Sequence, residues 1–268
     1  MPQSFNFIRL LKRGVDYLLS PLYLLHFCLV LLVFHPIQVL CFRLGGRPLQ
    51  QKAAALMNAF LVYGQLLTGS TTRFCFAATP PANRPLIFVA NHQSLFDIPP
   101  MGWWLRTYRP VFVAKKELEY GTPSVSYNLR RSGAALIDRT DARQSLAELG
   151  RLGNRLKARD CSVIIFPEGT RSRDGLPRPF AGAGLAILLK KAPDALIVPV
   201  AIHNTARFNP KGLFPFRSFT HLTWTVLPAI DPTGLSAEDV AEAARSAIAA
   251  QLKTGGREKG RKEEAAFR

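Results

Sequence analysis

The feature that most constrains this chain is a run of 26 residues without a charged side chain, Tyr17 to Phe42. As an α-helix, the run would be about 39 Å long, which exceeds the roughly 30 Å hydrocarbon core of a bilayer. Uncharged runs of this length are uncommon in soluble folds, so we expect residues 1–47 to attach the chain to a membrane. A buried core helix and a signal peptide are the alternatives, although the run is long for a signal peptide and lacks a clear small-residue cleavage site.

Neither the prolines within this run nor the charges beside it determine whether it spans the membrane or enters only one side. Pro21 and Pro36 interrupt it, and a break near Pro36 would make a re-entrant hairpin with both ends on the cytoplasmic side. Basic residues lie on both sides, so the positive-inside rule assigns no orientation. They are Arg9, Lys12 and Arg13 before the run, and Arg43 and Arg47 after it.

The charge balance of the chain favours anionic partners. Lys and Arg total 35 against 18 Asp and Glu, a formal net charge of +17. Such a surplus suits a phospholipid surface, a phosphate-bearing substrate or a nucleic acid. We expect no nucleic-acid partner, because no recognised binding motif accompanies the charge. The four cysteines form no CxxC pair and no Cys/His cluster has ligand spacing. We therefore expect reduced thiols facing the cytoplasm, and no metal site.

After Pro85 the sequence alternates between short apolar runs and helical stretches. The runs are typical of buried strands and cover 86–91, 110–115, 133–139, 161–169, 196–202 and 221–228. Helices are predicted at 140–159, capped by Thr140 or Asp141, at 180–192, and at 236–253, where Ser236 and Asp239 form a capping pair. This alternation predicts an α/β fold with a mixed, largely parallel central sheet flanked by helices.

Three regions follow from these patterns. Residues 1–47 form the membrane-anchoring segment, and residues 48–252 form the α/β domain, beginning with a helix at 48–69. The charged tail, 253–268, is predicted to be mobile or to lie against lipid headgroups.

The first candidate functional segment is 91–97, which follows a predicted strand directly. Ligands bind open α/β sheets at the carboxyl ends of strands. His92 can act as a general base near neutral pH, and a carboxylate on its other ring nitrogen would fix its tautomer. Asp97 is placed to supply that carboxylate across one turn. A helix-capping aspartate beside an incidental histidine is the alternative.

Cations follow other predicted strands. In segment 166–172, Gly169 permits a close approach of backbone to ligand, Thr170 offers a hydroxyl, and Arg171 has a planar fork suited to phosphate. Arg139 ends another strand, and Lys115 ends a third. Arg173 and Arg178 extend the basic character. Ordinary turns with exposed arginines, and a surface ion pair between Asp138 and Arg139, are the alternatives. The strand around Pro199 is expected to form a pocket wall or a sheet edge.

In this order, NHQSLFD (91–97), KKEL (115–118), GAALIDR (133–139), FPEGTRS (166–172) and VPV (198–200) resemble the motifs of the lysophosphatidic acid acyltransferases, within the glycerolipid acyltransferase superfamily. The resemblance covers residues 86–202. It implies a 1-acylglycerol-3-phosphate O-acyltransferase, which moves a fatty acyl group from acyl-CoA or acyl-acyl carrier protein to the free sn-2 hydroxyl of lysophosphatidic acid. The product is phosphatidic acid, and the expected location is the cytoplasmic face of a bacterial inner membrane.

The resemblance also implies roles for individual residues. His92 would deprotonate the acceptor hydroxyl, and Asp97 would orient His92. The hydroxyl oxygen would attack the thioester directly, since the chain has no G-x-S-x-G elbow to supply a serine nucleophile. Arg139, Thr170 and Arg171 would hold the substrate phosphate, Glu168 would contact glycerol oxygens, and Gly169 would give access, with Lys115 also in the substrate site. No cofactor or metal is expected.

Other functions fit parts of the sequence. Another lysolipid or glycerol-3-phosphate as acceptor would need similar chemistry. A basic nucleic-acid-binding protein and a membrane scaffold with an inactive site are more distant alternatives.

Overall fold

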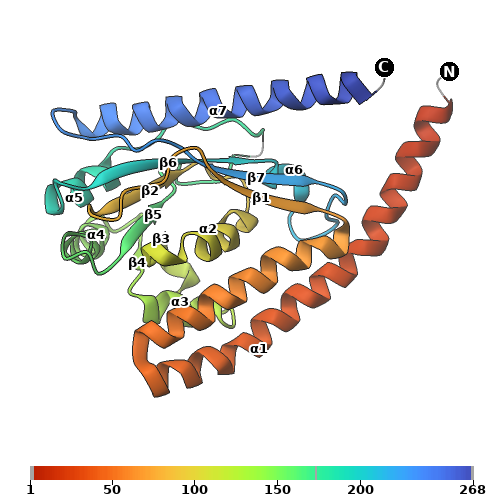
Figure 1. The fold of residues 1–268 in the computed structure, drawn as a ribbon. Coiled ribbons are helices and arrows are strands. Elements are labelled where there is room, and N and C mark those ends of the chain that lie inside the picture. Colours follow the sequence, from red (N-terminus) through yellow and green to blue (C-terminus); the bar gives the residue numbers. More distant parts are fainter. Residues whose placement is uncertain (1–2, 173, 267–268) are drawn as a thin grey trace.

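The computed structural model describes residues 3–172 and 174–266, and its side chains over residues 9–172 and 174–254 (Figure 1). Arg173, one of the predicted basic residues, lies outside the described part. The centre of the fold is a seven-stranded sheet in the order β1-β7-β6-β2-β5-β3-β4. Its strands are β1 Thr71–Phe76, β2 Leu86–Ala90, β3 Pro110–Lys115, β4 Ala135–Ile137, β5 Ser162–Ile165, β6 Leu196–His203 and β7 His221–Val226.

The predicted mixed, largely parallel sheet is confirmed. Every neighbouring pair of strands is parallel except β6 and β7, which are antiparallel. All six predicted strands are present. The strand that the sequence did not reveal is β1, an edge strand that contains Arg73 and is only partly buried. An edge strand has a neighbouring strand on one side only, so more of its surface is exposed. Its sequence therefore need not be the continuous apolar run of a strand inside a parallel sheet.

Helices cover the sheet and connect its strands. They are α1 Gln3–Tyr63, α2 Ile98–Trp104, α3 Val125–Ser132, α4 Ala142–Lys157, α5 Ala183–Lys191, α6 Thr205–Phe208 and α7 Ala237–Ala266, with short 3₁₀ turns at Gly64–Thr68, Leu95–Asp97, Arg106–Tyr108 and Lys116–Glu119. Asp141 caps α4 by accepting the Gln144 N–H at 2.9 Å. Ser236 and Asp239 form the predicted capping pair of α7. The predicted end of this last helix at 253 is wrong, since α7 continues to Ala266.

Two apolar layers bury the two faces of the sheet. Alternate residues of β2 point to opposite sides, with Ile87 and Val89 in one layer and Phe88 and Ala90 in the other. The first layer packs against α4, α5 and α7. The second contains Trp224 of β7 and a group of aromatic rings beneath α2. Figure 1 shows α7 on one side of the sheet, with α2 and the two arms of α1 on the other.

Pro199 lies in an internal strand, so the predicted edge position is wrong. β6 lies between β7 and β2, and Pro199 is paired with Val89 of β2. The antiparallel pairing with β7 begins only at Val200. Pro199 therefore precedes the first residue of β6 that pairs with β7. At the beginning of a strand pairing, a residue without a backbone N–H is tolerated.

Helix α1 is folded into a hairpin of two antiparallel arms (Figure 1). The reversal is at Gly45 and Gly46, where the backbone leaves the helical region, and Gly46 has φ 62° and ψ −156°. Only glycine adopts that conformation readily. The predicted break near Pro36 is therefore wrong, because the helix passes through Pro21 and Pro36 without interruption.

The hairpin is docked firmly on the α/β domain. Tyr23 is fully buried and packs edge-on against Phe216, with ring centroids 5.0 Å apart, and also against Phe96 and Phe208 at 5.8 Å. Its hydroxyl donates to the Leu61 carbonyl of the second arm at 3.3 Å. The first arm of α1 thus shares the core of the domain that follows it.

The other face of the hairpin is apolar and exposed. Within the described residues, α1 with the following 3₁₀ turn is the one stretch long and apolar enough to cross a membrane, judged by length and composition. Its most apolar window has a mean hydropathy of 2.2, and only 22% of that window is buried in the protein. A core helix of a soluble protein would be mostly buried. The exposed large apolar side chains include Leu18, Leu22, Leu25, Leu29, Leu32, Val33, Leu40, Leu44, Leu56 and Phe60.

Replacing Tyr23 tests how the hairpin is held. Tyr23→Ala is expected to lower the free energy of unfolding by about 3–5 kcal/mol, because a fully buried aromatic ring is removed from a packed cluster. Denaturant unfolding in detergent measures the change. Leu25→Ala is the matched control, since Leu25 is 58% exposed on the same arm and should change stability little. Equal effects of the two substitutions would contradict the docking described above.

Candidate active site

The structure brings His92 and Asp97 together at the carboxyl end of β2. His92 Nδ1 lies 2.7 Å from Asp97 Oδ2, across the short turn that connects β2 to α2. The His92 side chain is 17% exposed, whereas the Asp97 side chain is completely buried. The predicted contact between these two residues is confirmed. It leaves Nε2 as the ring nitrogen available to a substrate.

Asp97 is surrounded by hydrogen-bond donors. Besides His92, its Oδ2 accepts the backbone N–H groups of Gln93 at 2.6 Å and Ser94 at 2.9 Å. Its Oδ1 accepts the Thr205 hydroxyl at 2.5 Å. Four donors and no competing acceptor suit the ionised carboxylate, which is an acceptor only. Asp97 therefore also caps the turn at 95–97, so the capping alternative and the histidine-orienting alternative are both realised in one side chain.

Amide side chains fix the strand-to-helix turn to the neighbouring strand β6. The Asn91 amide donates to the Ile202 carbonyl at 2.9 Å and accepts the Ile202 N–H at 2.8 Å. The Gln93 amide donates to the same carbonyl at 3.0 Å. All three side-chain hydrogen bonds are buried, where their electrostatic contribution is larger than in water. They hold the backbone of His92 in one position relative to the sheet.

Segment 166–172 forms hydrogen bonds with both backbone polar groups of His92, its N–H and its carbonyl. The His92 N–H donates to Glu168 Oε1 at 2.9 Å, and the His92 carbonyl accepts the Ser172 N–H at 2.8 Å. The Phe166 ring packs on the imidazole, with centroids 4.4 Å apart. The two sequence motifs predicted to share a site therefore meet directly.

Glu168 is the second carboxyl group of the site. Burial raises the pKa of this carboxyl above its ordinary value of 4.5, and the hydrogen bond from the His92 N–H opposes the shift. Its Oε2 is buried and makes no hydrogen bond of normal geometry to the described residues, although the Arg178 N–H is close enough to lower the pKa of the carboxyl. A buried acceptor without a partner is costly, so Oε2 is suited to receive a hydroxyl of a bound ligand.

The predicted cations gather on one side of His92. Gly169 has φ 68°, and the guanidinium of Arg139 lies 3.6 Å from the position that a side-chain carbon at Gly169 would occupy. Lys115 ends β3 in register with Ile137 of β4, two residues before Arg139. Thr170 and Arg171 are exposed in the loop after β5. The sheet order thus brings Arg139, Lys115 and the 168–171 loop to the same edge, although no hydrogen bond or ion pair joins Lys115 to the loop within the described chain.

The Asp138–Arg139 ion pair considered from the sequence is absent from the described residues. Asp138 instead accepts the N–H and hydroxyl of Thr140, which lowers the pKa of its carboxyl, and Lys116 lies 3.8 Å away. Arg139 is therefore not engaged by its neighbouring carboxylate. No group of three metal-ligating side chains was found within the residues that the structure describes.

Thr205 is the functional residue that sequence reasoning missed. It is fully buried in α6, far along the chain from the motif that contains Asp97. Its position just after the strand predicted at 196–202 was the only available signal. Trp224 was also missed, and its indole N–H donates to the Asp97 carbonyl at 3.3 Å.

Fold and site together define an α/β domain with a His–Asp pair and convergent cations at the carboxyl ends of its parallel strands. The sequence model of the Acyltransferase family matches residues 75–203, a segment that contains His92, Asp97, Glu168 and the predicted cations, although not Thr205 or Trp224. Residues 75–203 therefore match the Acyltransferase family, and the resemblance seen in the motifs is confirmed.

Curated proteins and a solved structure agree with this assignment. The chain is 36% identical over 159 residues to human 1-acyl-sn-glycerol-3-phosphate acyltransferase beta, which covers 59% of this chain and 55% of that protein. It is 30% identical over 173 residues to a 1-acyl-sn-glycerol-3-phosphate acyltransferase of Chlamydomonas reinhardtii, over 65% of this chain and 50% of that protein. The matches thus span about half the length of these relatives.

The fold is also similar to the crystal structure of the 1-acyl-sn-glycerophosphate (LPA) acyltransferase, PlsC, from Thermotoga maritima. The TM-score is 0.73 at 23% sequence identity, over 91% of this chain and 97% of that one. The coverage includes the helical hairpin as well as the α/β domain.

Removing the Thr205 hydroxyl tests its support of Asp97. Thr205→Val keeps the shape of the side chain but leaves a buried carboxylate oxygen without its donor. We expect the free energy of unfolding to fall by about 1–3 kcal/mol. Thr205→Ser keeps the hydroxyl and is the matched control, so it should be closer to the parent in denaturant unfolding. Equal loss in both variants would mean that packing of the methyl group, not the hydrogen bond, matters at this position.

The raised pKa of Glu168 gives stability a defined pH dependence. The folded protein binds the Glu168 proton more tightly than the unfolded chain does, so this group stabilises the fold most at low pH. That contribution is lost as pH rises from 4.5 through the raised folded value. Glu168→Gln lacks the titration, so its unfolding midpoint relative to the parent should rise over this window and then level off. A constant difference across the window would contradict the raised pKa.

Proposed function

We propose that this chain is a membrane-attached acyltransferase, moving a fatty acyl group from a thioester to the free sn-2 hydroxyl of lysophosphatidic acid. The product would be phosphatidic acid. The main support is the His92–Asp97 hydrogen bond, because it leaves one imidazole nitrogen available to a substrate. Arg139 and Arg171, which make no ion pair within the described residues, follow neighbouring strands of the same sheet. The named activity of the curated relatives supports the choice of acceptor.

The chemistry requires one base and no covalent intermediate. His92 Nε2 takes the proton of the acceptor hydroxyl as the hydroxyl oxygen attacks the thioester carbonyl carbon. Asp97 holds Nδ1–H and stabilises the imidazolium that forms. When the tetrahedral intermediate collapses, the carbon–sulfur bond breaks, and the imidazolium returns the proton to the leaving thiolate. The ester product and the free thiol carrier leave with His92 restored.

The residues around the base would position the acceptor. Arg171, Arg139, Thr170 and Lys115 offer a planar fork, a hydroxyl and an ammonium group to a phosphate on one side of His92. Glu168 Oε2 would accept a hydrogen bond from a glycerol hydroxyl, which would satisfy its unpartnered oxygen. Gly169 allows the loop between these groups to adopt φ 68°, a backbone conformation that a residue with a side chain would adopt only with strain. No metal or organic cofactor has a role in this scheme.

The hairpin would place this site at a membrane surface. Its exposed apolar face suits lipid, while its two arms return to the same end of the domain without a separate linker. Attachment to the cytoplasmic face of a bacterial inner membrane fits the free cysteines. Either acyl-CoA or acyl-acyl carrier protein fits the basic charge of the chain, because both carriers are acidic.

Substituting the base tests the proposed reaction. His92→Ala is expected to lower kcat by about a hundredfold to ten-thousandfold, the usual contribution of a general base. Phosphatidic acid formation is measured with purified protein, lysophosphatidic acid and either acyl donor. Unfolding midpoints of parent and variant show whether the fold is intact. Full turnover by a folded His92→Ala variant would exclude His92 as the base.

Substituting Arg171 separates acceptor binding from chemistry. Arg171→Ala should raise the KM for lysophosphatidic acid about tenfold to a hundredfold, because a charge-assisted hydrogen bond is worth roughly 1.5–3 kcal/mol. We expect kcat and the KM of the acyl donor to change little. Arg143→Ala, an exposed arginine of α4 outside the motifs, is the matched control. An unchanged acceptor KM in Arg171→Ala would remove Arg171 from the phosphate site.

A further inference from the structure

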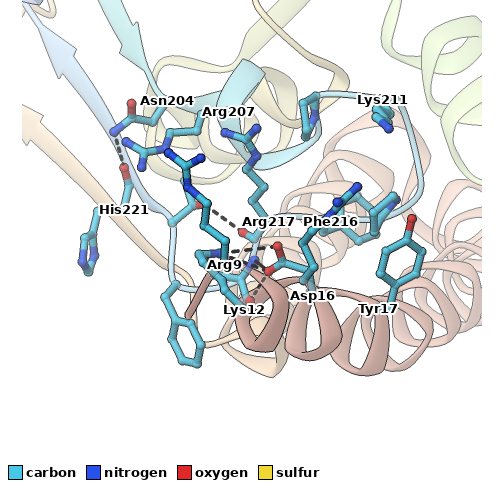
Figure 2. A pocket seen from close by; sticks show the side chains of 16 residues that line it. Arg9, Lys12, Asp16, Tyr17, Asn204, Arg207, Lys211, Phe216, Arg217 and His221 are labelled. Carbon is cyan, nitrogen blue, oxygen red and sulfur yellow. Dashed lines mark hydrogen bonds and ion pairs between the residues drawn. The ribbon is translucent and has the colours of Figure 1, made fainter. Parts of the chain in front are cut away.

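A basic cavity lies outside the proposed acceptor site. It has a volume of about 700 Å³ and is lined by the first turns of α1 together with residues 204–221 (Figure 2). Six cationic side chains line it against a single carboxylate, that of Asp16. The cations are Arg9, Lys12, Arg13, Arg207, Lys211 and Arg217.

Asp16 is already occupied by other donors. Its Oδ1 accepts the Ser218 N–H at 2.8 Å and the Ser218 hydroxyl, and Lys12 Nζ lies 3.2 Å away. By contrast, Arg13, Arg207, Lys211 and Arg217 are exposed, and none of these side chains has an acceptor within hydrogen-bond or ion-pair distance in the described chain. Figure 2 shows the guanidinium groups of Arg207 and Arg217 reaching into the space above α1, where Arg9 also lies. Several like charges held around one cavity repel one another unless an anion is bound.

The cavity is a fixed part of the fold. Its loop is attached to α1 at two points, where the Phe216 N–H donates to the Ser20 hydroxyl at 2.8 Å and Ser218 binds Asp16. Phe216 itself is buried against Tyr23. The backbone that carries these cations is therefore held in place, so a ligand that binds them does not have to order the loop.

Strand order separates this cavity from the proposed acceptor phosphate site. Arg139 and Arg171 follow β4 and β5, on one side of β2 and its His92. The cavity lies on the other side of β2, beyond β6 and beside the start of β7. Helix α6 connects it to the His–Asp pair, since Thr205 binds Asp97 and Arg207 lines the cavity.

Apolar side chains form part of the rim. Tyr17 and Phe219 line the cavity and are exposed, and Tyr17 packs edge-on against the exposed Phe214 with centroids 5.4 Å apart. From Leu18 onward, α1 continues directly into the exposed apolar face of the hairpin. Phosphate-binding cations next to an apolar strip match a lipid whose headgroup is anionic and whose chains lie along α1.

We propose that this cavity binds the phosphate group of an anionic phospholipid headgroup, as a site separate from the acyl acceptor. Arginine forks bind phosphate oxygens in pairs, and the lysines add charge without a fixed geometry. A headgroup bound there would hold the edge of the sheet that carries His92 close to the lipid surface. The proposal does not depend on acyl transfer, because binding is measured without turnover.

Vesicle binding by the full chain tests the proposal. Binding to phosphatidylcholine vesicles reports the apolar hairpin, and the extra binding when phosphatidylglycerol is added reports recognition of the anionic headgroup. The ratio of the two affinities is the selectivity. Replacing both Arg207 and Lys211 with alanine should lower the selectivity about tenfold while leaving binding to phosphatidylcholine unchanged.

A matched pair on the hairpin controls for diffuse charge. Arg43 and Lys52 are likewise one arginine and one lysine, are exposed, and lie outside the cavity. Replacing both with alanine should leave the selectivity near that of the parent. An equal loss in the two pairs would overturn the proposal in favour of general surface electrostatics. If the first pair alters the unfolding midpoint, Lys211→Glu alone, on an exposed loop, provides the same test.

A second experiment distinguishes binding of a lipid from binding of a soluble anion. The detergent-solubilised chain is titrated with inorganic phosphate and with 3′,5′-ADP, the phosphorylated nucleotide portion of coenzyme A. Saturable binding that is lost in the Arg207/Lys211 pair, together with unchanged vesicle selectivity, would overturn the lipid assignment. Loss of vesicle selectivity without saturable binding of either soluble anion would support it.

Discussion

The buried carboxylate of Asp97 is the interaction on which the site depends. A carboxylate removed from water is costly unless donors replace its hydration, and here His92, Gln93, Ser94 and Thr205 supply them. The hydrogen bonds from these donors to Asp97 fix three features of the site. The turn after β2 is closed, α6 is tied to it, and the imidazole has one orientation. The geometry of the site is therefore a consequence of satisfying one buried charge.

The hairpin and the sheet form one packed unit because they share an aromatic core. Tyr23 from the hairpin lies among rings contributed by the turn at 95–97 and by residues 208–216, which border the site and the basic cavity respectively. The apolar face outside and the aromatic core inside belong to the same helix. This arrangement gives the exposed apolar face of the hairpin a rigid connection to the His–Asp pair, with no flexible linker between them.

Much of the fold was predictable because its signals are local. Six strands and the caps of α4 and α7 follow from short runs and single residues, and the approach of Asp97 to His92 follows from one turn of chain. Of these strands β2, β5 and β6 are buried as predicted, whereas β3, β4 and β7 are only partly buried. The sequence analysis predicts the turn of the hairpin near Pro36, whereas Gly45 and Gly46 are the better signal. A long apolar helix can continue through a proline. The backbone conformation of Gly46, in contrast, is readily adopted only by glycine. Edge strand β1 and Thr205 could not be predicted, since only tertiary contacts give them their roles.

The tautomer of His92 is the most direct measurement of the central claim that Asp97 prepares this imidazole to accept a proton. Nitrogen-15 NMR of histidine-labelled protein, with His92→Ala to assign the signal, distinguishes the two ring nitrogens. We expect a proton on Nδ1 and an unprotonated Nε2 in the neutral ring, and loss of this preference in Asp97→Asn. A proton on Nε2 in the parent protein would exclude His92 as the base in this arrangement, because that nitrogen could not then take the proton of an acceptor hydroxyl.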